Sequence, residues 1–96
     1  MNNLHYGKQT LVNLVVRDSC PLCTEITNKL ESLHVNNKSF QLTVINLDKG
    51  ETMPNNKGYV ITPSIFINNR LWNIGDFEIS AFQNKLNSII NTVSKN

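Results

Sequence analysis

Two cysteines separated by two residues are the strongest chemical signal in this sequence of 96 residues. Cys20 and Cys23 enclose Pro21 and Leu22, and the chain has no other cysteine. One thiolate of such a pair can attack a disulfide, and the second thiol can then resolve the mixed disulfide. Two cysteines are too few for a scaffold stapled by several disulfides. We therefore expect redox chemistry at this pair.

The pair lies where a helix is predicted to begin. Pro21 suits the first helical position, because its missing N–H would be unpaired there in any case. Cys20 then falls at the N-cap, where free backbone N–H groups and the helix dipole favour a thiolate. Such a position lowers a cysteine pKa from about 8.5 to roughly 3.5–7.5. We predict Cys20 as the nucleophile, Arg17 as a nearby positive charge, and Cys23 as the resolving thiol.

Two other uses of the cysteine pair stay open. A structural zinc ion takes four protein ligands, and only His5 and His34 add to the two cysteines. His5 lies in a predicted tail, and His34 lies at the far end of the predicted helix. Buried cysteines also serve as plain core residues. We predict no bound metal ion, and a Cys-x-x-Cys pair beside a strand–helix–strand unit favours the redox interpretation.

Hydrophobic periodicity predicts the elements that hold the pair. An apolar run over 10–17 predicts a central strand buried on both faces. Helical spacing over 21–34 predicts a helix, with Asn36 or Asn37 as a left-handed cap. Alternation over 40–47 predicts a second strand. These elements form a βαβ unit with parallel strands and a right-handed crossover.

The second half of the chain predicts a turn region and a hairpin. Pro54 allows a short helix over 54–57 that Gly58 would close. Short β-type runs at 64–68 and 70–74 flank an Asn-Asn pair that tolerates left-handed backbone, so we expect a tight hairpin.

A last helix is predicted after the hairpin. Gly75 ends the hairpin, and Asp76 is expected as the helix N-cap. An apolar stripe at helical spacing then continues to Val93. We predict an α/β fold, with a four-stranded mixed β-sheet and helices on its faces. One domain would span 10–93, between tails at 1–9 and 94–96.

The chain resembles the thioredoxin-like superfamily, and within it the small glutaredoxin-like proteins. The resemblance rests on the Cys-Pro-Leu-Cys sequence after a strand and on Gly-Tyr-Val-Ile-Thr-Pro at 58–63 before a hairpin. It implies that Pro63 is cis and lies beside the cysteine pair. It also implies that Thr62 offers its backbone to an extended substrate. Leu22 stands where glutaredoxins carry an aromatic residue and Ser19 where thioredoxins carry Trp, so the subfamily stays open.

Further site residues follow from the same resemblance. Arg17 matches a basic residue that contacts glutathione in the family, and Asp76 lies near a matching acid. Gly75 corresponds to part of a Gly-Gly pair before the last helix. Pro21 and Leu22, between the cysteines, complete the predicted substrate contacts. Glutathione or a thioredoxin-reductase-type donor would return electrons, and no resident cofactor is required.

Composition limits the partners and the location. Nine Lys and Arg against seven Asp and Glu give a net charge of +2, and the basic residues are scattered. We therefore expect no nucleic-acid surface. The apolar run 11–16 is shorter than the ~20 residues of a membrane helix, and 1–8 lacks the pattern of a secretory signal. We expect a cytoplasmic monomer that acts on protein or low-molecular-weight disulfides.

A second function remains open. The chain would be a non-enzymatic thioredoxin-fold binding or assembly module, in which two copies bridge a metal or iron-sulfur centre through Cys20.

Overall fold

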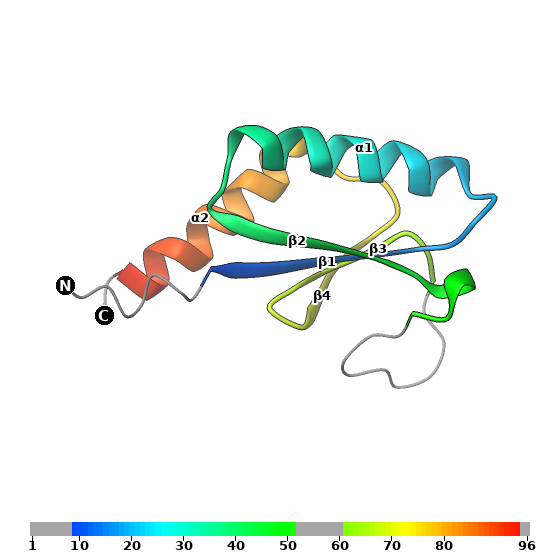
Figure 1. Ribbon diagram of the computed structural model, residues 1–96. Coiled ribbons are helices and arrows are strands. Elements are labelled where there is room, and N and C mark those ends of the chain that lie inside the picture. The colour runs from blue at the N-terminus through cyan, green and yellow to red at the C-terminus, as the bar shows by residue number, and fades with distance from the viewer. Residues whose placement is uncertain (1–8, 52–60, 95–96) are drawn as a thin grey trace.

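The computed structural model describes residues 9–51 and 61–94, with side chains as far as Ile89 (Figure 1). The predicted short helix over 54–57 and Gly58 lie outside these residues. In the described ranges, no helix is long and apolar enough to cross a membrane. The elements follow in the order β1 (Thr10–Val16), α1 (Pro21–Asn36), β2 (Phe40–Asn46), the 3-10 turn η2 (Leu47–Lys49), β3 (Ser64–Ile67), β4 (Arg70–Ile74) and α2 (Ile79–Ser94).

The four strands form one mixed sheet in the order β2-β1-β3-β4. β1 runs parallel to β2, as the βαβ unit requires, and antiparallel to β3, which in turn pairs antiparallel with β4. The predicted α/β fold is therefore confirmed, and the topology is thioredoxin-like. The register sets Val16 opposite Asn46 and Val15 opposite Ser64. The end of β1, the end of β2 and the start of β3 consequently meet at one edge of the sheet (Figure 1).

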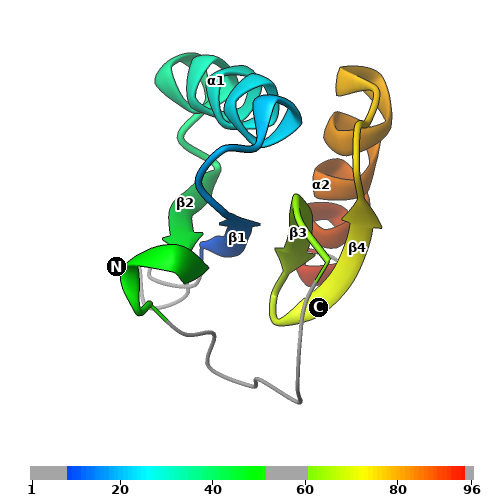
Figure 2. The same ribbon diagram turned by 90° about the vertical axis from the view of Figure 1, so that its right-hand side faces the viewer.

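Figure 2 shows both helices beside the strands of the sheet. Among the described residues, one buried cluster joins the helices to the sheet. Leu14 and Ile65 from the sheet, Ile26 and Leu30 from α1, and Phe82 from α2 are fully buried in it. Burying a side chain of this size stabilises a fold by roughly 1.5–3 kcal/mol. This packing fixes α1 over β1 and β2, and so fixes the place where the helix begins.

The hairpin forms around two asparagines, as predicted. Asn68 has φ 51° and Asn69 has φ 70°, and a two-residue turn needs such left-handed backbone at both positions. Asn68 is also bonded to β1: its N–H donates to the Leu11 carbonyl at 2.8 Å, and its Oδ1 accepts from the Leu11 N–H at 2.9 Å. The turn is thereby tied to the central strand.

The cap predicted for α1 is wrong. The helix continues to Asn36, and Asn37 caps it in extended backbone with φ −145°, not in a left-handed conformation. Asn37 Oδ1 accepts from the Ser39 N–H at 3.0 Å, and this side-chain turn directs the chain into β2 without a left-handed residue. Strand β2 also ends one residue earlier than predicted, because Asn46 caps η2 by accepting from the Asp48 N–H.

The N-cap predicted for α2 is also wrong. The helix begins at Ile79, three residues after Asp76. Asp76 Oδ1 instead accepts from Lys29 Nζ at 2.9 Å and from the Phe77 N–H at 2.8 Å, so its carboxylate is bonded before the helix starts. Gly75 has φ 87° and follows the end of β4, which confirms the predicted break.

Candidate active site

A disulfide joins Cys20 and Cys23 across the first turn of α1, with their Cα atoms 5.1 Å apart. Cys20 is half-buried, whereas Cys23 is only 3% exposed. An attacking sulfur reaches a disulfide only through an accessible atom. The two cysteines are therefore unequal, and Cys20 is the one that solvent and other molecules can approach.

Cys20 caps the helix, as the sequence predicts. Its backbone is extended, with φ −127° and ψ 96°, and its Sγ accepts from the Cys23 N–H at 3.1 Å. Its carbonyl accepts the first helical bond, from the Thr24 N–H at 3.1 Å. Pro21 follows at the first helical turn. The sulfur of Cys20 thus lies against the positive end of the helix dipole, which favours a thiolate when the pair is reduced.

Arg17 does not stand as a free charge beside Cys20. Its guanidinium donates to Asp48 Oδ1 at 2.8 Å, and the two side chains are 47% and 34% exposed. The other carboxylate oxygen of Asp48 accepts from the Asp18 N–H at 2.8 Å. Asp48 therefore holds two successive residues of the loop that leads from β1 to Cys20.

Asn46 closes a ring of hydrogen bonds at this loop. Its Nδ2 donates to Asp18 Oδ1 at 3.0 Å, and its Oδ1 accepts from the Asp48 N–H at 2.9 Å. We call Asp18, Asn46 and Asp48 the loop anchor. The position of these residues in the sequence could have indicated the loop anchor. Asn46 ends β2, which runs parallel to β1, and Asp48 follows it, so both lie where β1 also ends.

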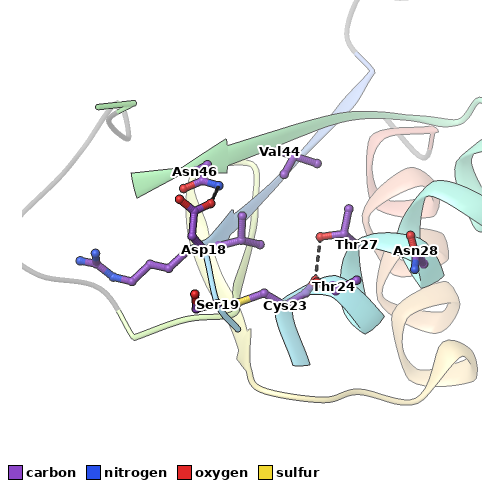
Figure 3. A pocket seen from close by; sticks show the side chains of 10 residues that line it. Asp18, Ser19, Cys23, Thr24, Thr27, Asn28, Val44 and Asn46 are labelled. Atoms are coloured by element: carbon purple, nitrogen blue, oxygen red, sulfur yellow. Dashed lines mark hydrogen bonds between the residues drawn. The ribbon is translucent and has the colours of Figure 1, made fainter. Parts of the chain in front are cut away.

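A pocket of about 310 Å³ lies between the loop anchor and the start of α1 (Figure 3). Asp18 and Asn46 point toward one another on one side, and Cys23 and Thr27 stand on the other (Figure 3). Thr27 Oγ1 donates to the Cys23 carbonyl at 2.7 Å. The full lining is Val16, Arg17, Asp18, Ser19, Cys23, Thr24, Thr27, Asn28, Val44 and Asn46.

Thr62, Pro63 and Gly75 lie together at the sheet edge from which the loop to Cys20 departs. The Thr62–Pro63 peptide bond is cis, Pro63 is buried and Thr62 is half-buried. The Gly75 N–H donates to the Pro63 carbonyl at 2.8 Å. Because Val15 pairs with Ser64, Pro63 continues β3 toward the end of β1. These three predicted site residues are therefore joined to one another.

Asp76 is bonded to α1 rather than left free. Lys29 Nζ donates to its Oδ1 and to the Phe77 carbonyl, both at 2.9 Å, and lies 4.7 Å from the centre of the Phe77 ring. The hydrogen bond from Lys29, followed by that from the Phe77 N–H, lowers the pKa of Asp76 below its ordinary value. Arg17 and Asp76, two predicted ligand contacts, thus each pair with another residue of the chain.

His34, the histidine that the structure describes, lies far along α1 from the cysteine pair. The His34 ring packs edge-on against Phe40 at 5.1 Å, near the end of α1, and His5 lies outside the described residues. Within residues 9–51 and 61–94, no three His, Cys, Asp or Glu side chains are grouped closely enough to hold a metal ion.

No protein-family model matches the chain, and no curated protein matches it either. The assignment of chemistry therefore rests on the geometry of the site. That geometry contains a cysteine pair, bonded to each other at a helix N-terminus, with one sulfur accessible and the other buried.

Proposed function

We propose that this protein is a thiol–disulfide oxidoreductase of the glutaredoxin or thioredoxin type, with Cys20 as nucleophile and Cys23 as resolving thiol. One observation carries the proposal: half-buried Cys20 caps α1 with its sulfur, 3.1 Å from the Cys23 backbone nitrogen, and is joined by a disulfide to the buried Cys23. Thiol–disulfide exchange can open and re-form such a bond. A helix N-terminus lowers the pKa of a thiol, which supplies the thiolate that attacks.

The reaction passes two electrons. The Cys20 thiolate attacks one sulfur of a substrate disulfide, forms a mixed disulfide and releases the first substrate thiolate, which takes up a proton. Cys23 then loses its proton and attacks Cys20 Sγ. The Cys20–Cys23 disulfide forms, and the second substrate thiolate departs. The substrate is reduced to two thiols, and the enzyme is left in the oxidised form that the structure shows.

Substrate contacts are proposed around the accessible sulfur. Thr62 and Pro63 would bind an extended substrate backbone, and Gly75, which donates to the Pro63 carbonyl, would support them. Pro21 is exposed and Leu22 half-buried beside Cys20, so both would contact the substrate. Protein or low-molecular-weight disulfides are the proposed substrates.

The electron donor would be two molecules of glutathione or a thioredoxin-reductase-type protein, and the cytoplasm is the proposed compartment, because thiols are kept reduced there. Arg17 and Asp76 already bind Asp48 and Lys29. To bind the charged ends of glutathione, both would have to exchange these partners, which favours a substrate held mainly by its backbone.

The test is a single turnover of bis(2-hydroxyethyl) disulfide by the pre-reduced wild type, Cys20→Ser and Cys23→Ser, with the protein as the only thiol present. We expect Cys20→Ser to show only the background rate. Cys23→Ser should complete the first attack and accumulate a mixed disulfide on Cys20, visible as added mass. A wild-type rate in Cys20→Ser would show that the proposal is wrong.

Purification without oxygen separates this function from the assembly module. A colourless protein that reduces the disulfide supports the oxidoreductase. A coloured dimer that contains metal and is inactive in the assay would favour the module that bridges a centre through Cys20.

A further inference from the structure

The loop that carries Cys20 has little packing on its helix side. Arg17, Asp18 and Ser19 are exposed, and all three line the pocket of about 310 Å³ that separates them from Thr24 and Thr27 on α1. Loops without apolar contacts are the parts of a protein that open most readily. The conformation of this loop must therefore be held by polar contacts.

The loop also adopts a conformation that its residues disfavour. Ser19 has φ 55°, in the left-handed region, which is unfavourable for an L-residue other than glycine. This residue sets the direction in which the chain enters Cys20, whose extended backbone in turn aims Sγ at the Cys23 N–H. If Ser19 left this conformation, Cys20 Sγ would be the first group to move away from the Cys23 N–H.

Asp48 is the residue best placed to prevent this relaxation. Both of its carboxylate oxygens are used on the loop, one by the Arg17 guanidinium and one by the Asp18 N–H, each at 2.8 Å. Asp48 is itself fixed in the η2 turn, which is capped by Asn46 at the start and by Gly50, with φ 79°, at the end. The turn lies beside β1 because Asn46 pairs with Val16.

We propose that Asp48 is a positioning residue for the nucleophile: through its bond to the Asp18 N–H it fixes the loop that presents the Cys20 sulfur to the helix N-terminus. This role rests on the proposed function, since it matters for catalysis only if Cys20 attacks disulfides. The ion pair with Arg17 contributes less, because an exposed pair must order a long, flexible side chain and is screened by solvent. A charge-assisted bond to a backbone N–H is stronger and more directional.

The experiment isolates Cys20 in a Cys23→Ser background and measures its alkylation by iodoacetamide as a function of pH. Asp48→Ala removes both contacts, whereas Asp48→Asn removes the ion-pair charge but keeps an oxygen that accepts from the Asp18 N–H. Glu31→Ala, which deletes an exposed carboxylate of α1, is the matched control for lost charge. Thermal unfolding of each variant reports the fold.

We expect Asp48→Ala to lower the alkylation rate at neutral pH by about tenfold, as for the loss of one hydrogen bond to a charged group. The pH profile should move to higher pH. Asp48→Asn, which keeps a weaker, uncharged acceptor, should shift less than Asp48→Ala, and Glu31→Ala should stay close to the parent. A parent-like rate and profile in Asp48→Ala would overturn the proposal. Equal losses in Asp48→Asn and Asp48→Ala would also overturn it, because the bond to Asp18 would then not be the anchor.

Asn46→Ala provides a second variant if Asp48→Ala does not fold. It removes the bonds to Asp18 Oδ1 and from the Asp48 N–H but keeps every charge. It should shift the profile in the same direction, and a parent-like profile would contradict the role of the loop anchor. Alkylation of Cys20 needs no catalytic turnover, so the two proposals can fail separately. If the wild type did not reduce disulfides but Asp48→Ala still slowed alkylation of Cys20, the proposed function would be wrong and the positioning role of Asp48 would stand.

Discussion

The segments that lead into the two helices of this protein are held in place by different contacts. The approach to α1 (residues 17–20) has three exposed residues before Cys20, is bonded to Asp48 and Asn46, and lies beside a pocket. The approach to α2 (residues 75–78) is also bonded to a distant charge, Lys29, but it carries the buried Phe77. Each approach takes part in one ion pair with a carboxylate, Arg17–Asp48 before α1 and Lys29–Asp76 before α2. The two approaches therefore differ in the apolar packing around the ion pair.

Aromatic contacts make the approach to α2 the more rigid of the two. The Phe77 and Phe82 rings lie 5.6 Å apart, and Trp72 packs edge-on against Phe77 at 5.8 Å and against Phe82 at 5.6 Å. Each such pair contributes about 0.5–1.5 kcal/mol beyond the burial of its area. The proposed chemistry lies instead at the approach to α1, where hydrogen bonds set the orientation of the loop and where Arg17, Asp18 and Ser19 are exposed.

The largest effect expected from this difference is on stability. Phe82→Ala should lower the free energy of unfolding by about 3–5 kcal/mol, because it removes a fully buried ring of α2 that packs against Phe77 of the α2 approach. Val44→Ala, at the pocket beside the α1 approach, should cost only about 1 kcal/mol, since Val44 is half-buried. Urea unfolding measures both, and equal losses would remove the distinction between a packed and an unpacked approach.

A smaller effect should appear at the helix cap. Cys20→Ser keeps a side-chain oxygen that can accept from the Cys23 N–H, whereas Cys20→Ala leaves that donor without the cap. Neither variant can form the disulfide, so the comparison isolates capping. Cys20→Ser should be more stable than Cys20→Ala by about 1 kcal/mol. The same unfolding free energy for both would mean that the Cys20 side chain does not stabilise α1.

The smallest effect should be a pH dependence at the α2 approach. The pKa of Asp76 is lowered in the folded state, first by the hydrogen bond from Lys29 and then by that from the Phe77 N–H. The ionised carboxylate therefore stabilises the fold above its unfolded pKa, and this contribution is lost as the pH falls through the lowered folded value. Asp76→Asn should flatten stability in that acid range, measured by melting temperature against pH. A wild-type slope in Asp76→Asn would show that another group carries it.

Local patterns were sufficient to predict most of the fold. The run of branched apolar residues in β1, the proline at the start of α1 and the paired asparagines of the hairpin each act over a few residues, and the structure has all three where they are expected. The N-cap position of Cys20 follows from the same kind of signal, since a proline at the first helical turn places the residue before it at the cap.

The features that sequence reasoning missed depend on residues far apart in the chain. Arg17 and Asp48 are 31 positions apart, and Lys29 and Asp76 are 47 apart, so neither pair has a local signal. Asp76 is a good capping residue by type, but Lys29 binds its carboxylate once α1 is packed, and α2 begins later. The pocket beside Cys23 is lined by residues from separate parts of the chain, so the spacing of residues in the sequence does not predict it.

The two positions of the hairpin turn carry the same residue type, yet they should tolerate different substitutions. At Asn69, the structure shows a left-handed backbone, which glycine also adopts readily. At Asn68, the side-chain oxygen also accepts from the Leu11 N–H of β1, the strand that leads to Cys20. Glycine can therefore replace Asn69 without changing the turn. Position 68 keeps its bond to β1 only if the new side chain has a carbonyl or carboxylate oxygen at the same distance, as aspartate does.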